Sequence, residues 1–281
     1  MRVMRFSPIN VMEKTSFSLI TRVGDYLSYL WQYRSIFIIS VRNDIKGRFK
    51  NTFLGYFWHL LNPLSQIVIY FLIFTVIFGK GIPNYWVYIS TGMFAFGFFM
   101  SIVPNGSNCI VANSRMVTKM AMAREILVFS KATVNLIYLS ISYTILSILM
   151  IITGVGLSWN VLFVPLIVIS FFVFCIGLAL ALSAIVVYIR DVSNVVSILM
   201  GCMLFAVPII YMASQRSTPA MEIFWSINPL YYYIETIHDA FYWGVCPDLF
   251  QLGVCLILAP ISFLIGLAIF KKLEKGFAER L

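Results

Sequence analysis

Six long apolar segments run along the chain, separated by stretches that differ in length and polarity. A helix needs about 20 largely apolar residues to cross a hydrocarbon core about 30 Å thick, and each segment meets that requirement. None of them contains Asp, Glu, Lys or Arg. The pattern predicts six membrane-spanning helices, at Leu54 to Phe78, Tyr85 to Val103, Thr133 to Thr153, Val161 to Val187, Val192 to Met212 and Leu249 to Phe270.

A different pattern precedes the first span, between Asp25 and Asn51. Apolar residues recur there at steps of three and four, which places them on one side of a helix. Such a helix is expected to lie in the headgroup plane, with its basic side toward anionic lipid or a cytoplasmic partner. A plain surface anchor without a partner is the alternative. The apolar side holds Leu30, Tyr33, Phe37, Val41 and Ile45, and the basic side holds Arg42, Lys46 and Lys50.

The stretch from Ala213 to Asp248 is too apolar for an ordinary exposed loop, yet Glu235, His238 and Asp239 interrupt it. Asn228-Pro229 breaks any helix in its middle. We therefore expect two short helices that dip into the outer leaflet between spans 5 and 6 and border a cavity or pore mouth. Its aromatic residues fit either an interfacial belt or a surface on which sugar rings stack. These are Tyr231, Tyr232, Tyr233, Phe241, Tyr242 and Trp243.

Composition and charge agree with a membrane protein. Of the 281 residues, 61% are hydrophobic and 11% are charged, whereas soluble domains have about 25% charged residues. Eighteen of the twenty Lys and Arg residues lie on one side of the predicted spans, and only Lys80 and Arg216 lie on the other. Because cytoplasmic loops carry the basic excess, both termini are predicted to be cytoplasmic. The net charge of +9 is thus explained by orientation, without nucleic-acid binding.

The polar residues exclude several function classes. Ion-coupled transporters usually keep ionisable groups within their spans, and these spans have none. No paired carboxylates, metal ligands or activated nucleophile predict a catalytic site, and His238 with Glu235 and Asp239 is the nearest polar cluster. The only Gly-Lys pair, Gly79-Lys80, lacks the first glycine of a phosphate loop. A transport role would therefore need a separate energy-supplying chain.

Three motifs, in this order, resemble one family. The first is RNDIKGRFKNTFLGYFW, from Arg42 to Trp58, followed by Asn62-Pro63-Leu64. The second is Arg190-Asp191-Val192 with Pro208-Ile209-Ile210-Tyr211, and the third is NPLYYYIE, from Asn228 to Glu235. They resemble type-2 ABC transporter permeases that export lipid-linked O-antigen, teichoic acid or capsule polysaccharides. Asn43 and His238 stand where arginine is common in such relatives, which leaves the role of His238 open.

The resemblance implies a homodimer of six-span subunits in the bacterial plasma (inner) membrane. Two separate cytoplasmic ATP-binding subunits would bind ATP and Mg, so this chain would not be an enzyme and would hold no cofactor. It also implies three parts: a cytoplasmic N-terminus with an interfacial helix (1–53), an all-α six-span permease domain (54–270) and a cytoplasmic tail (271–281). Its partners would be those subunits, membrane lipids and the lipid-linked polysaccharide.

Site residues follow from the same resemblance. A cationic cluster on the inner face suits a pyrophosphate-linked lipid, because Lys and Arg bind phosphate well. The basic stretch from Asn113 to Glu125 is expected to grip the ATPase subunit, although from the sequence alone it could equally be a simple connection. The lipid-phosphate group is Arg42, Asp44, Lys46, Arg48 and Lys50; the path or gate is Trp58, Tyr70, Tyr231, Tyr232, Tyr233, Glu235 and His238; the ATPase contact is Arg115, Lys119, Arg124 and Glu125.

Two other functions fit the same sequence. A type-2 ABC permease could move a smaller amphiphile, such as a drug or lipid, and its deletion would then change drug tolerance. A membrane scaffold could instead recruit cytoplasmic proteins through its basic side, without any ATP-dependent flux.

Overall fold

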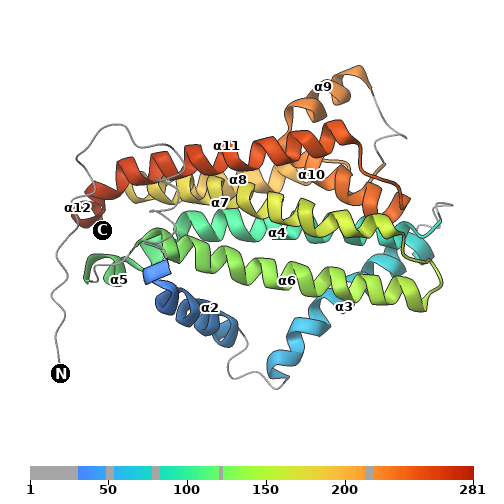
Figure 1. The fold of residues 1–281 in the computed structure, drawn as a ribbon, viewed down its shortest axis with the longest axis horizontal. Helices are drawn as coiled ribbons and strands as arrows, with labels where there is room; N and C mark the ends of the chain where they lie inside the picture. Colours follow the sequence, from blue (N-terminus) through green and yellow to red (C-terminus); the bar gives the residue numbers. More distant parts are fainter. Residues whose placement is uncertain (1–30, 49–53, 78–82, 120–122, 213–217) are drawn as a thin grey trace.

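The computed structural model describes residues 31–48, 54–77, 83–119, 123–212 and 218–281. All regular secondary structure within these ranges is helical, without a strand. Four long helices lie side by side and form the body of the molecule (Figure 1). They are α4 (Tyr85–Ala112), α6 (Glu125–Ile152), α7 (Val164–Tyr188) and α11 (Leu249–Leu273).

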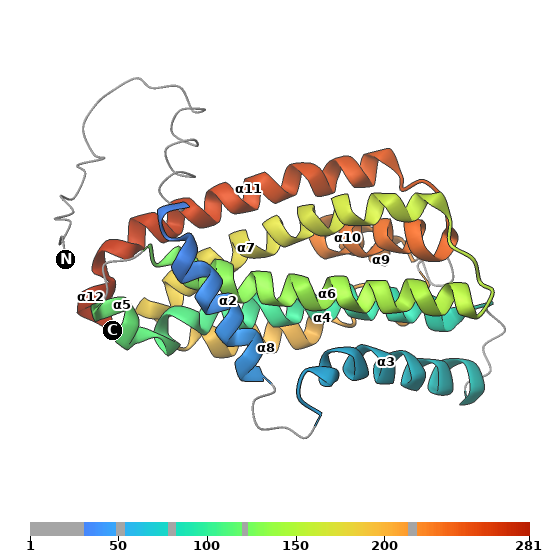
Figure 2. The ribbon, with the colours of Figure 1, turned by 60° about the horizontal axis from the view of Figure 1, so that its bottom comes forward.

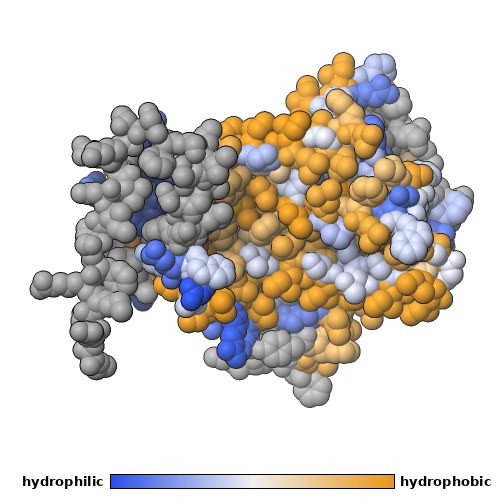
Figure 3. Space-filling view, viewed as in Figure 1, coloured by the Kyte–Doolittle hydropathy of each residue, from blue (hydrophilic) through white to orange (hydrophobic). Residues whose placement is uncertain are grey.

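Each of these four helices, taken with the short helical turns continuous with α7 and α11, is long and apolar enough to cross a membrane. Apolar side chains cover much of the face seen in Figure 3. Helix α7 is the centre of the bundle, because it packs against α4, α6, α10 and α11. A multi-pass membrane protein is therefore confirmed.

Two shorter apolar helices occupy the other two predicted spans. Helix α3 (Trp58–Tyr70) contains the buried Pro63 and continues into the π-helical turn η2 (Phe71–Ile77). Helix α8 (Val192–Met203) ends well before Met212, the predicted end of its span. Non-helical backbone follows it up to Met212, because Pro208 has no amide hydrogen and disfavours helical geometry at the residue before it.

The amphipathic segment before the first span contains α2 (Arg34–Arg48), a helix that packs against α6. Figure 2 shows α2 crossing the long helices obliquely, with α3 beyond its far end. The predicted segment began at Asp25 and ended at Asn51, and both of its ends lie outside the described residues. The N-terminal 30 residues also lie outside them.

The outer segment forms two short helices on either side of Asn228, as the sequence predicted. Thr218 and Asn228 each cap the helix that follows, and a proline stands at its first position. Such residues are favoured there because the cap oxygen accepts a free amide hydrogen and proline has none to satisfy. The helices are α9 (Pro219–Ile227) and α10 (Pro229–His238), followed by the π-helical turn η5 (Asp239–Trp243).

The remaining elements are short. They connect the long helices or end the chain, and several lie at the end of the bundle where the C-terminus is found. They are η1 (Gly55–Phe57), α5 (Ser114–Lys119), η3 (Trp159–Phe163), η6 (Glu274–Gly276) and α12 (Phe277–Arg280).

Candidate functional site

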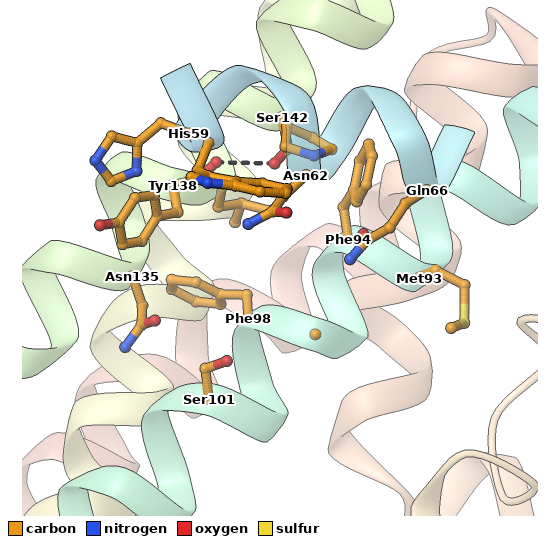
Figure 4. Close-up of a pocket in the computed structure, with 14 residues that line it drawn as sticks. His59, Asn62, Gln66, Met93, Phe94, Phe98, Ser101, Asn135, Tyr138 and Ser142 are labelled. Carbon is orange, nitrogen blue, oxygen red and sulfur yellow. Dashed lines mark hydrogen bonds between the residues drawn. The ribbon is translucent and has the colours of Figure 1, made fainter. Parts of the chain in front are cut away.

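A cavity of about 210 Å³ lies between α3, α4 and α6 (Figure 4). Helix α4 contributes Phe94, Phe98 and Gly97, and the amide and hydroxyl groups come mainly from α3 and α6. We call it the intramembrane pocket. Its lining is Trp58, His59, Asn62, Pro63, Gln66, Met93, Phe94, Gly97, Phe98, Ser101, Asn135, Tyr138, Leu139 and Ser142.

The polar side chains of the intramembrane pocket follow helical spacing. Asn62 and Gln66 lie one turn apart on α3, while Asn135, Tyr138 and Ser142 lie at steps of three and four on α6. Each set therefore points from one face of its helix. Figure 4 shows Asn62 and Gln66 extending from α3 toward α4. Polar groups within spans usually face a protein interior or a cavity rather than lipid.

None of the fourteen lining residues is acidic, lysine or arginine. The imidazole of His59 lies against the ring of Tyr138, with ring centroids 4.8 Å apart, at one side of the pocket. The amide group of Asn135 donates to the carbonyl of Lys131 at 3.0 Å, which fixes its orientation. Amides, hydroxyls and aromatic faces without a fixed charge can bind a neutral, hydroxyl-rich ligand by hydrogen bonds and apolar contact.

Toward the end of the bundle that carries the C-terminus (Figure 2), Asp44 on α2 pairs with Lys131 on α6, at 2.7 Å between Oδ1 and Nζ. This ion pair holds α2 against the bundle. Arg42 and Lys46 are exposed and border an apolar groove formed by Phe37, Ile38, Val41 and Ile45. The side chain of Arg48 and the whole of Lys50 lie outside the described residues.

The predicted ATPase contact divides into two kinds of residue. Arg115 and Lys119 on α5 are exposed. Glu125, at the start of α6, is fully buried, and its carboxylate lies 2.7 Å from Nζ of Lys271. Arg124 is half-buried and donates to the backbone carbonyl of Glu274 at 2.6 Å.

The predicted path or gate residues of the outer segment also differ in exposure. Tyr231 is half-buried and stacks on Trp225, whereas Tyr233 is fully buried and donates to the carbonyl of Cys255 at 2.8 Å. Tyr232 is half-buried and donates to the carbonyl of Ser226. Tyr70, on α3, packs beside Tyr85 and Tyr88 at the start of α4 rather than in the pocket.

His238 is buried beneath Tyr88, with ring centroids 3.9 Å apart. Its Nε2 lies 3.1 Å from the carbonyl oxygen of Tyr88, and its Nδ1 lies 3.7 Å from the carboxylate of Glu235. Gly92 makes room for the imidazole, because a Cβ there would lie 2.8 Å from Nε2. Burial, and then the nearby carboxylate of Glu235, raise the pKa of Asp239 to about 6.

Tyrosines of α4 hold the non-helical backbone after α8. The hydroxyl of Tyr88 donates to the carbonyls of Pro208 and Tyr211, and the hydroxyl of Tyr85 donates to the carbonyl of Ile210. Backbone at membrane depth needs such partners, because lipid offers none. The non-helical backbone up to Met212 is therefore fixed to α4.

Residues 35–242 match the family described as ABC-2 type transporter. The matched region contains the whole pocket and most of the outer segment. The chain belongs to the ABC-2 type transporter family.

This ABC-2 chain is also similar to curated permeases over nearly its whole length. It is 28% identical over 251 residues to the O-antigen export system permease protein RfbA of Myxococcus xanthus, covering 89% of this chain and 96% of the relative. Two proteins of the same name from Klebsiella pneumoniae are 29% and 28% identical over 255 residues, covering 90% of this chain and 96% of each relative. The predicted resemblance is confirmed.

Most residues of the pocket in this ABC-2 chain were not predicted as site residues from the sequence. Of the predicted path residues, only Trp58 lines it. The signal that could have found the others is the spacing of uncharged amides and hydroxyls within two charge-free spans: Asn62 with Gln66, and Asn135 with Ser142. A search for ionisable groups passes over such residues.

Proposed function

We propose that this chain is the membrane-spanning permease subunit of an ATP-driven exporter of lipid-linked polysaccharide, of the O-antigen kind. The observation that carries the proposal is the intramembrane pocket, whose amides, hydroxyls and aromatic rings suit sugar and whose lining lacks fixed charge. The names of the relatives support the same substrate class.

The inner face supports a phosphate-bearing lipid as the carrier. Arg42 and Lys46 are exposed beside an apolar groove on α2, and a cationic site next to apolar surface suits a pyrophosphate joined to a hydrocarbon tail. Asp44 contributes indirectly, by tying α2 to Lys131. Arg48 and Lys50 are proposed as further phosphate contacts on their charge and position in the motif.

The proposed assembly is a homodimer with two cytoplasmic ATP-binding subunits, in the bacterial inner membrane with both termini cytoplasmic. ATP and Mg would bind to those subunits, and this chain would contribute no catalytic group. Helices α3 and α8 are proposed as the first and fifth of six spans, and both carry exposed apolar residues suited to a second subunit, including Leu60, Val68, Ile198 and Leu199. The outer helices α9 and α10 are proposed to re-enter the outer leaflet and gate the exit.

A double replacement in the pocket tests the substrate path. Changing Gln66 and Asn135 to leucine is expected to lower the amount of polysaccharide at the cell surface by about thirtyfold, because each of the two lost hydrogen bonds contributes about 1 kcal/mol. Surface polysaccharide is measured in cells that carry the variant as their only copy of the gene, at matched permease levels in the membrane.

The matched control for this test is Ser140→Leu. Ser140 is exposed on α6 and borders an apolar groove with Leu60 and Ile137, away from the pocket. The control is expected to export normally. Unchanged export by the pocket variant would show that the substrate does not pass through the pocket. A change in drug tolerance, with surface polysaccharide unchanged, would indicate that the transported substrate is a smaller amphiphile.

A further inference from the structure

The last residues of the chain are fastened to the start of α6 by a buried ionic cluster. Nζ of Lys271 lies 2.7 Å from the carboxylate of Glu125, which is fully buried, and 3.1 Å from the carboxylate of Glu274. Arg124 adds a hydrogen bond to the backbone carbonyl of Glu274. We call these four residues the C-terminal clasp. A carboxylate without exposed surface requires such partners.

Aromatic packing fixes the same segment. Phe277 is fully buried, and its ring meets that of Phe270 edge-on at 5.5 Å. The hydroxyl of Tyr188, at the end of α7, donates to the carbonyl of Leu273 at 2.9 Å. Gly276 leaves room for that hydroxyl, since a Cβ there would overlap it. The segment is thus a built part of the fold that joins α6, α7 and α11.

The clasp brings exposed basic residues from two distant parts of the chain together. Helix α12 contacts α5, and both lie at the same end of the bundle (Figures 1 and 2). Arg115 and Lys119 are exposed on α5, and Lys275 and Arg280 are exposed on η6 and α12. A surface with an excess of basic residues therefore combines α5 with the C-terminal turn, in which Glu279 is also exposed.

We propose that this composite surface, and not α5 alone, receives the ATP-binding subunit, through an acidic region of that partner. This inference rests on the proposed function, because the partner is the one that an ATP-driven permease needs. A soluble protein is favoured over anionic lipid for a physical reason. Attraction to lipid headgroups needs only charge, whereas here the clasp and the buried Phe277 hold in place the backbone that carries Lys275 and Arg280.

Charge reversal in the C-terminal turn tests the proposal. The variant K275E/R280E is expected to retain about tenfold less ATP-binding subunit than the unaltered permease, because two attractions become repulsions. Retention is measured by purifying the permease in neutral detergent without anionic lipid, from cells that also make the subunit. The matched control K275R/R280K keeps both charges and is expected to retain the subunit fully.

Two further variants keep the outcome clear. R115E/K119E changes α5 and is expected to lose the subunit to a similar extent. Because Arg280 also lies over the ring of Tyr188, the single change Lys275→Glu is made as well, and it is expected to reduce retention with an unaltered elution profile in size-exclusion chromatography.

Full retention by K275E/R280E and Lys275→Glu, beside loss by R115E/K119E, would overturn the composite surface and leave the proposed function intact. If the charge-reversed variants retained less ATP-binding subunit only after anionic lipid was added, the surface would bind the membrane instead. That result would also overturn the composite surface as a docking site for the subunit. If the unaltered permease itself retains no ATP-binding subunit, the proposed function fails.

Discussion

Replacing Gly266 with leucine is expected to abolish the folded permease. Gly266 on α11 faces Gly177 on α7, and any Cβ at Gly266 would overlap the backbone carbonyl of Gly177. Gly177 in turn lies against the backbone of Ser262. Small residues let membrane helices approach closely, and van der Waals contact between them replaces the hydrophobic drive available in water. A leucine side chain would separate the two helices that anchor the bundle.

The measurement is the fraction of detergent-extracted permease that elutes as a single folded species in size-exclusion chromatography. Gly253→Leu is the matched control, because Gly253 lies on the same helix and an added Cβ there meets nothing within 4 Å. The control is expected to elute like the unaltered protein. A normal profile for Gly266→Leu would show that α7 and α11 do not cross as closely as described.

Replacing Lys271 with alanine is expected to destabilise the permease by about 3 kcal/mol, the lower end of the range for breaking a buried pair, because Lys271 itself is 38% exposed. The fully buried Glu125 would lose its Lys271 partner while remaining in the protein interior. Thermal unfolding in detergent, followed by the loss of folded protein on heating, measures the effect.

Lys272→Ala is the matched control for this prediction. Lys272 is the next residue on the same helix and is exposed, so its removal is expected to change the unfolding temperature little. Lys271→Arg keeps the cation and is expected to recover most of the stability. If Lys271→Ala and Lys272→Ala changed the unfolding temperature equally, the clasp would not stabilise the fold.

Helix α6 connects the C-terminal clasp with the pocket. Its start carries Glu125 of the clasp, its next turns carry Lys131, which holds α2, and its middle carries Asn135, Tyr138 and Ser142. A displacement of the composite surface would therefore reach the pocket through one continuous helix. Such physical continuity makes α6 the element in which coupling mutations are best sought.

The number and order of the apolar helices could be read from the sequence, since hydrophobic length is a local property. The residue at which α8 ends could not be read from it. The residues up to Met212 are as apolar as a span, but their helix ends at Met203, ahead of Pro208. The unwound backbone that follows receives hydrogen bonds from Tyr85 and Tyr88, which lie more than a hundred residues earlier in the sequence. Pro208 was the only local signal.

The candidate site shows the same division. The position of a helix break at Asn228-Pro229 was predicted, because capping and proline geometry are local. The ion-pair partners of Glu125 and Asp44 were not predicted. Lys271 and Lys131 lie far from them in the sequence, and other basic residues near each lysine look equally suitable as partners. Burial of Tyr233 and His238 likewise depends on how α10 packs into the bundle.

Transport by the purified components tests the central claim most directly. Liposomes containing this permease, its ATP-binding subunit and a fluorescent lipid-linked polysaccharide are incubated with ATP, and the polysaccharide that becomes accessible on the opposite side is measured. We predict movement that requires both proteins and stops with a nonhydrolysable ATP analogue. Movement that is independent of ATP or of the second subunit, or no movement of polysaccharide while a small amphiphile is carried, would contradict the account.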